Sequence, residues 1–82
     1  MTREYIERQP GWVATFRCLR NGNFVCLMQT PTRHWYWSYP DYQALFPYGA
    51  TGPFDAAFLK DALSRHVLEP VAWTPALPQE WA

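Results

Sequence analysis

An Asn-Gly pair at positions 21 and 22 separates two runs of strand-forming residues, 12–19 and 24–28. Asn-Gly between two such runs is the strongest short-range signal of a β-hairpin, because a type I′ turn requires positive φ at both central residues. If Asn21 and Gly22 form a two-residue loop, Arg20 pairs with Asn23 and the register of both strands follows. The sequence therefore predicts an antiparallel hairpin on which the rest of the fold must build.

This register assigns each side chain of the hairpin to one of two sheet faces, because successive residues of a strand alternate. The expected cross-strand pairs are Leu19 with Phe24, Cys18 with Val25, and Phe16 with Leu27. The face expected to form the core carries Trp12, Ala14, Phe16, Cys18, Val25 and Leu27. The other face carries Val13, Thr15, Arg17, Leu19, Phe24, Cys26 and Met28. Since the two cysteines point to opposite faces, no disulfide between them is expected.

Residues 33–39 have the alternation and aromatic content of a third antiparallel strand. Its predicted faces are Trp35, Trp37 and Tyr39 on one side, and His34, Tyr36 and Ser38 on the other. Pro40 ends this strand because it cannot donate the next ladder hydrogen bond. A further short strand is expected over residues 4–8.

The second half of the chain contains the main helix. Asp55 is its expected N-cap, with Phe54 and Leu59 as a hydrophobic staple. The apolar stripe continues through Phe58, Ala62, Leu63, His66 and Val67. Before it, a capped turn is expected over residues 41–46 and a loop over residues 48–53. Beyond it, Pro70, Pro75 and Pro78 predict an extended arm over residues 69–82, with Val71 to Trp73 against the sheet.

These elements predict an α+β fold: a small antiparallel sheet of three to four strands, one main helix packed on a face, and an extended Pro-rich C-terminal arm. With 82 residues and no composition shift, the chain is expected to form a single domain over 1–82. The N-terminus lacks a signal peptide and no apolar run reaches membrane-spanning length, so a cytoplasmic protein without membrane contact is expected. Formal net charge is zero and favours no polyanionic partner.

Catalytic and metal-binding patterns are weak. Cys26, a histidine at 34 or 66, and an aspartate at 41 or 61 supply the residue types of cysteine catalysis, but any small protein with two histidines and two cysteines would offer them. Two cysteines at this spacing match no zinc motif. We expect free thiols, no metal, no other cofactor and no enzymatic activity.

Aromatic content is the main functional signal, since five Trp, five Tyr and five Phe exceed what so small a core accommodates. Protein interfaces are enriched in aromatic residues and arginine and depleted in lysine, and this chain has a single lysine. The residues predicted to bind a partner are Arg33, Trp35, Trp37 and Tyr39, with Arg17 and Arg20 on the hairpin. The sequence thus predicts a small non-catalytic protein-binding module, such as a bacterial or phage-type accessory factor or inhibitor.

Three alternatives use the same residues. Basic and aromatic residues interleaved over 33–39 are also typical of a single-stranded nucleic-acid binder, although no nucleic-acid motif accompanies them. The aromatic strand could instead pair with its symmetry mate in a homodimer. The rings could also act in the core alone, compensating for its small size.

Overall fold

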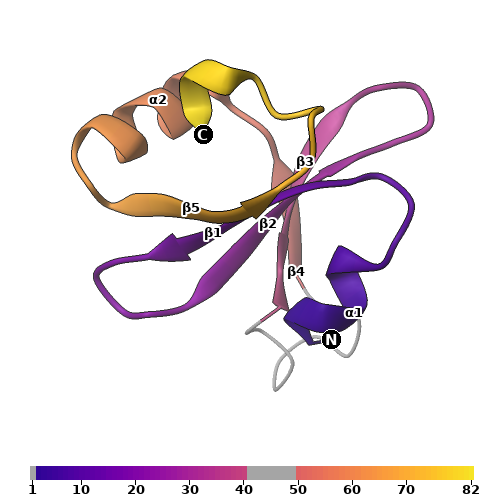
Figure 1. Cartoon of the computed structure of the whole chain (residues 1–82), viewed down its shortest axis with the longest axis horizontal. Coiled ribbons are helices and arrows are strands. Elements are labelled where there is room, and N and C mark those ends of the chain that lie inside the picture. Colours follow the sequence, from indigo (N-terminus) through magenta and orange to yellow (C-terminus); the bar gives the residue numbers. More distant parts are fainter. Residues whose placement is uncertain (1, 41–49) are drawn as a thin grey trace.

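The computed structural model describes residues 2–40 and 50–82, which form an α+β domain. Its five strands make one antiparallel sheet in the order β4-β3-β2-β1-β5 (Figure 1). The strands are β1 (Trp12–Cys18), β2 (Phe24–Gln29), β3 (Trp35–Tyr39), β4 (Ala50–Pro53) and β5 (Leu68–Trp73). The α+β class, the antiparallel sheet and the single main helix are confirmed, but the sheet has five strands rather than three or four.

The hairpin of β1 and β2 exists, but its turn is longer than predicted. Cys18 N donates to Asn23 O at 2.7 Å and Gly22 N donates to Cys18 O at 2.8 Å, so four residues separate the closing pair. Gly22 has φ +76°, whereas Asn21 is not among the described non-glycine residues with positive φ, so the type I′ turn is wrong. Asn21 instead uses its side-chain oxygen to accept from Asn23 N at 2.9 Å.

The longer turn shifts the register by two residues, so that Phe16 pairs with Val25 rather than with Leu27. Because side chains alternate with a period of two, this shift leaves each of these residues on its predicted face. A bulge in β1 changes two others, since the pairing passes from Trp12 with Met28 directly to Ala14 with Leu27. The extra residue, Val13, is buried in the main core, and Trp12 turns to the opposite face, contrary to prediction.

The N-terminal segment forms a helix, α1 (Arg3–Glu7), and the strand predicted over residues 4–8 is wrong. Thr2 caps this helix by accepting from Tyr5 N, and Arg3 pairs with Glu7 one turn later at 2.6 Å. Ile6 is buried against Cys26 and Met28 of β2. A local cap and an i,i+4 ion pair therefore prevail over the weak alternation of the segment.

The main helix, α2 (Ala56–Ser64), connects the two edge strands β4 and β5. Asp55 is its N-cap, as predicted, and accepts from Ala57 N at 2.9 Å. The helix ends two residues before His66, which adopts φ +56°. His66 N donates to Leu63 O and Val67 N to Ala62 O, the hydrogen bonds of a Schellman motif with histidine in the position that usually holds glycine.

The chain segments on either side of α2 differ from the prediction. Residues 50–53, expected in a loop, form β4, while the turn predicted over 41–46 lies outside the described residues. The extended arm over 69–82 is not confirmed: Leu68–Trp73 form β5 and Gln79–Trp81 form a short 3₁₀ turn. Pro70 is compatible with β5 because this strand is at the sheet edge, where one missing ladder donor is tolerated.

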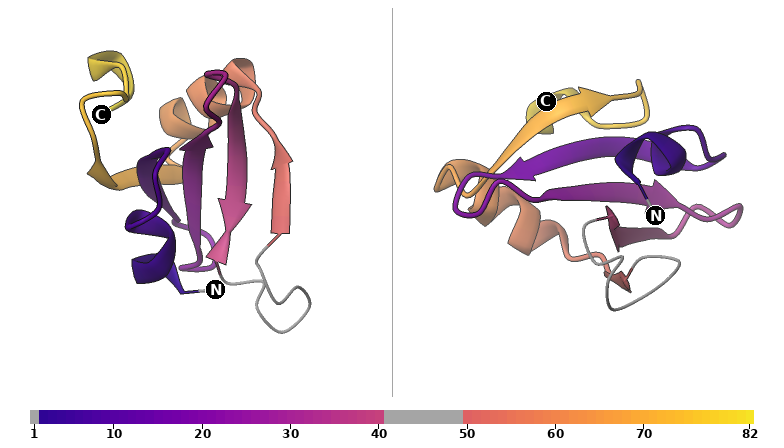
Figure 2. Two further views of the ribbon diagram at one scale, coloured as in Figure 1. Left: turned by 90° about the vertical axis from the view of Figure 1, so that its right-hand side faces the viewer. Right: turned by 90° about the horizontal axis from the view of Figure 1, so that it is seen from below.

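The two faces of the sheet carry separate cores under the two helices, which lie at different ends of the sheet (Figure 2). The larger core, on the α2 side, contains Val13, Ala14, Phe16, Val25, Leu27, Trp37, Leu59, Ala62, Leu68 and Leu77. The smaller core, under α1, contains Ile6, Cys26 and Met28, with Trp12 and Tyr36 packed beside them. Trp35, Trp37 and Tyr39 of β3 share one face, as predicted, and this face lies on the larger core.

Candidate functional site

The aromatic residues predicted as binding anchors pack into the protein. Trp37 is 3% exposed and its ring lies edge-on to Phe16, with 5.9 Å between centroids. Trp35 packs against Phe54 and Tyr39 against the larger core, both partly buried. The row Trp35, Trp37 and Tyr39 is therefore the inner face of β3 and does not project as a set of exposed rings.

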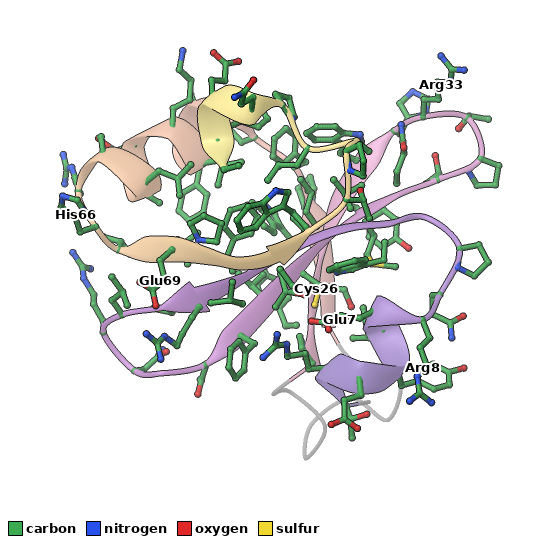
Figure 3. All side chains as sticks on the ribbon, viewed as in Figure 1. Glu7, Arg8, Cys26, Arg33, His66 and Glu69 are labelled. Carbon is green, nitrogen blue, oxygen red and sulfur yellow. The ribbon has the colours of Figure 1, made fainter. Side chains whose placement is uncertain are left out.

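The predicted arginines lie apart from one another. Arg33 adopts φ +66° in the turn between β2 and β3 and points away from the body of the protein (Figure 3). Arg17 lies on the opposite face from the aromatic row and forms an ion pair with Glu69 of β5. Arg20 is exposed in the turn between β1 and β2. The structure thus does not gather the predicted binding residues into one surface.

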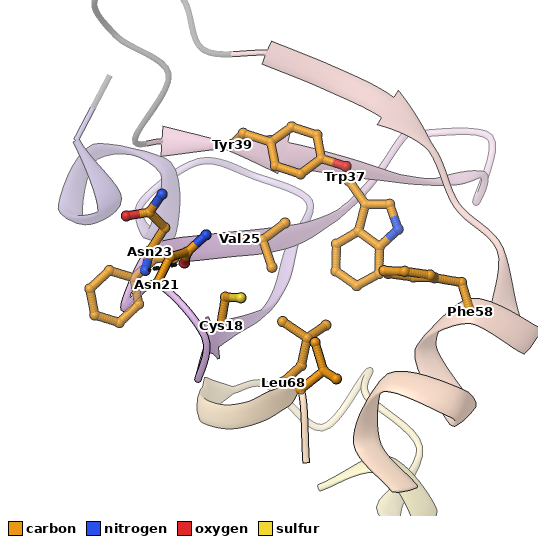
Figure 4. Close-up of a pocket in the computed structure, with 10 residues that line it drawn as sticks. Cys18, Asn21, Asn23, Val25, Trp37, Tyr39, Phe58 and Leu68 are labelled. Carbon is orange, nitrogen blue, oxygen red and sulfur yellow. Dashed lines mark hydrogen bonds between the residues drawn. The ribbon is translucent and has the colours of Figure 1, made fainter. Parts of the chain in front are cut away.

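A pocket forms instead where the β1–β2 turn, β3, α2 and the start of β5 meet (Figure 4). Its volume is about 220 Å³. We call it the hairpin pocket; it is lined by Cys18, Asn21, Asn23, Phe24, Val25, Trp37, Tyr39, Phe58, Val67 and Leu68. Two of the predicted binding residues, Trp37 and Tyr39, form part of its wall.

The hollow follows from side-chain size and helix geometry. Leu59 and Ala62 of α2 are buried against the sheet, whereas Phe58, next to Leu59 in sequence, lies at the margin and is 53% exposed. Phe58 still contacts the core, because its ring lies edge-on to Trp37 at 6.4 Å. The sheet residues below, Cys18 and Val25, are too small to fill the space between these rings and the hairpin turn.

The chemistry of the hairpin pocket is that of an uncharged apolar site. Among its described lining residues there is no carboxylate, imidazole, ammonium or guanidinium group. Its amide-bearing residues, Asn21 and Asn23, come from the exposed turn and supply neutral hydrogen-bonding groups. Such a site can hold an apolar group by desolvation but offers no acid-base pair.

Apart from the hairpin pocket, a polar cluster joins α1 to the sheet. The Thr15 hydroxyl, fully buried, donates to Glu7 Oε2 at 2.6 Å and accepts from Trp12 Nε1 at 3.1 Å. Cys26 Sγ lies 3.3 Å from the same hydroxyl oxygen. Because the only Thr15 proton goes to Glu7, the Cys26 thiol is the donor in this contact, and the hydroxyl uses its one proton and both lone pairs.

The residue types that cysteine catalysis would need lie apart in the structure. Cys26 is beneath α1, whereas His34 bonds Thr32 in the β2–β3 turn and His66 ends α2. The structure therefore brings neither histidine to Cys26. Within residues 2–40 and 50–82, no group of three or more His, Cys, Asp or Glu side chains is placed to hold a metal ion.

The sequence indicated only Trp37 and Tyr39 among the lining residues of this pocket. The lining residues that it did not indicate as binding residues are Cys18, Asn21, Asn23, Phe24, Val25, Phe58, Val67 and Leu68. The sequence predicts Asn21 and Asn23 at the hairpin turn and Phe58 in the apolar stripe of the helix. No periodic pattern relates the first hairpin to the segment after α2. Only the pairing of β5 with β1, which sets Leu68 beside Cys18, brings them together.

Comparison with known proteins gives no relative: no family model, no curated protein and no solved structure matches the chain. In the described part of the chain, no helix has the length and apolar character needed to cross a membrane.

Proposed function

We propose that this protein is a small, non-catalytic protein-binding module of the cytoplasm, in which the hairpin pocket receives one large apolar side chain of a partner. The observation that carries the proposal is an apolar cavity of about 220 Å³ beside a half-exposed aromatic ring, Phe58. Binding sites in protein interfaces commonly consist of a pocket that one buried anchor residue fills.

The size of the pocket favours a side chain over a small-molecule ligand. Sites for drug-sized ligands and cofactors occupy roughly 300–1,000 Å³. The hairpin pocket is smaller than this range but has room for a single large side chain. Phe58, 53% exposed, stands at the margin of the pocket and adds apolar surface beside it. An anchor in the pocket would thus be surrounded by further contacts that exclude water.

The proposal changes the role of the predicted aromatic residues. Trp37 and Tyr39 act as walls that receive an anchor, and Arg20 lies in the turn that borders the pocket. Trp35, Arg33 and Arg17 are not needed at this site. Base stacking requires exposed ring faces, so the burial of Trp37 does not favour the nucleic-acid alternative. The role of accessory factor or inhibitor remains part of the proposal.

Selection from a random peptide library displayed on phage tests the function without a known partner. We expect the wild-type protein to enrich peptides that share one aromatic or large aliphatic residue. Filling the pocket with Cys18→Phe should abolish binding, and Phe58→Ala should weaken it. The matched control is Tyr5→Ala, because Tyr5 is a similarly exposed aromatic residue, at 49%, on α1.

Two results would contradict the proposal, provided that each variant retains the dispersed amide spectrum of a folded protein. One is a set of enriched peptides that bind the Cys18→Phe protein as tightly as wild type. The other is equal loss of binding in Phe58→Ala and Tyr5→Ala, which would locate the binding surface elsewhere. Pairing of the aromatic strand with a symmetry mate is not open to β3, because β2 and β4 occupy both of its edges. Self-association through another surface would appear as a concentration-dependent mass in sedimentation experiments.

A further inference from the structure

We infer that the occupant of the hairpin pocket is an uncharged aromatic residue of a peptide segment, whose backbone is held by the side-chain amides of Asn21 and Asn23. The inference rests on the proposed function and specifies the partner chemistry of the same site. It follows from the charge, the shape and the hydrogen-bonding groups of the pocket.

The charge of the lining excludes an ionic anchor. Ten described residues line the pocket and none carries a charged side chain. Moving a lysine or glutamate head group into such a site would remove its hydration without providing a counter-charge, which is strongly unfavourable. The complement of this lining is a neutral side chain.

The shape of the lining favours an aromatic ring. Aromatic side chains of Trp37, Tyr39 and Phe58 line the pocket from β3 and α2, whereas the Phe24 ring lies on the other face of the sheet beneath the guanidinium group of Arg3. Phe58 meets Trp37 at an interplanar angle of 83°, so the pocket presents both ring edges and ring faces. Aromatic pairs prefer such edge-to-face contacts, and a rigid ring loses less conformational entropy on burial than a long aliphatic side chain.

The rim of the pocket carries the groups that recognise a peptide backbone. Asn21 Oδ1 accepts from Asn23 N, which orients the Asn21 side chain and leaves its NH₂ group available as a donor. The carboxamide of Asn23, also exposed, supplies both a donor and an acceptor. When the ring of an aromatic partner residue enters the pocket, the backbone N–H and C=O of that residue remain at the rim. There the side-chain amides of Asn21 and Asn23 can form hydrogen bonds with them.

Two probes separate the ring from the backbone. N-acetyl-phenylalanine N-methylamide carries both, whereas toluene carries the ring alone. Titration of each into ¹⁵N-labelled protein, followed through the amide signals of Cys18, Val25 and Leu68, measures affinity at the pocket. N-acetyl-lysine N-methylamide is the charged comparison and should not perturb these signals.

Asn23→Ala removes one carboxamide while keeping the backbone bond from Cys18 N to Asn23 O. We expect this variant to bind the capped phenylalanine about three- to tenfold more weakly, the effect of one neutral hydrogen bond, and to bind toluene with unchanged affinity. Gln9→Ala is the matched control, because it removes a partly exposed carboxamide that donates to Tyr5 O of α1. It should alter neither affinity.

The outcomes distinguish this inference from the proposed function. If Asn23→Ala leaves the capped phenylalanine affinity unchanged, or if capped lysine binds equally well, the inference is wrong while an apolar anchor pocket remains. If the capped phenylalanine fails to bind while toluene or a capped leucine binds, the peptide or aromatic part is wrong. If no probe perturbs the pocket signals, both the inference and the proposed function fail.

Discussion

Phe58 lies edge-on to Trp37, with 6.4 Å between the ring centroids, although Trp37 is 3% exposed and Phe58 is 53% exposed. This contact marks the boundary between the core and the hairpin pocket. One ring is part of the hydrophobic interior and the other is half available to a partner. Substitutions at these two positions should therefore separate stability from recognition.

We expect Phe58→Ala to lower the free energy of unfolding by about 1 kcal/mol, because only part of the ring is removed from water. Trp37→Ala should cost about 3–5 kcal/mol, since it leaves a cavity in the core. Urea denaturation followed by fluorescence and circular dichroism measures both. Equal losses for the two variants would mean that Phe58 is a core residue, and the pocket would then lose its exposed wall.

Replacing Thr15 by valine tests the polar cluster under α1. Valine preserves the shape of threonine, so the loss comes from leaving Glu7 and Trp12 without their hydroxyl partner, and should be about 1–3 kcal/mol. Guanidinium denaturation of Thr15→Val measures it. Thr15→Ser keeps the hydroxyl and should retain most of the polar contribution; if serine and valine were equally destabilising, the network would contribute little.

The histidine at the end of α2 makes a stabilising substitution available. His66 adopts φ +56°, where a side chain with a Cβ is strained and glycine is not. His66→Gly should therefore raise the free energy of unfolding by about 0.5–1 kcal/mol. Thermal unfolding measures the change, and Ser64→Gly is the comparison: Ser64 is the last residue of the helix and its hydroxyl donates to Asp61 O, so this glycine should destabilise the protein. A loss of stability in His66→Gly would refute the argument from strain.

The two cysteines should differ in reactivity. Cys18 is partly exposed in the wall of the hairpin pocket, whereas Cys26 is 0% exposed under α1. In the native protein, an aromatic disulfide reagent should modify Cys18, and Cys26 should react only on unfolding. Mass spectrometry after proteolysis assigns the site, and Cys18→Ser should remove the fast phase. Simultaneous modification of both thiols in the folded protein would contradict the burial of Cys26.

The local elements of the fold could be predicted from the sequence because their causes are local. Alternation predicts Phe16 and Val25 on one face of the hairpin, and a shift of register by two residues did not alter this result. The side-chain cap of Asp55 likewise depends on residues within one helical turn. Where two local signals competed, at residues 3–7, the cap and ion pair of a helix prevailed over a weak strand pattern.

The burial of individual side chains and the position of the pocket were decided by tertiary structure, because they depend on which distant segments bury each other's surface. The sequence by itself determined the hairpin, the division of the β3 side chains between two faces, and the start of α2. Whether Trp37 is an anchor or a core residue depended on α2 lying over that face, and Pro70 became part of a strand only because β1 provided an edge. The hairpin pocket has the same origin: its walls come from the first hairpin, β3, α2 and β5, and no local pattern determines the space that four packed elements leave unfilled.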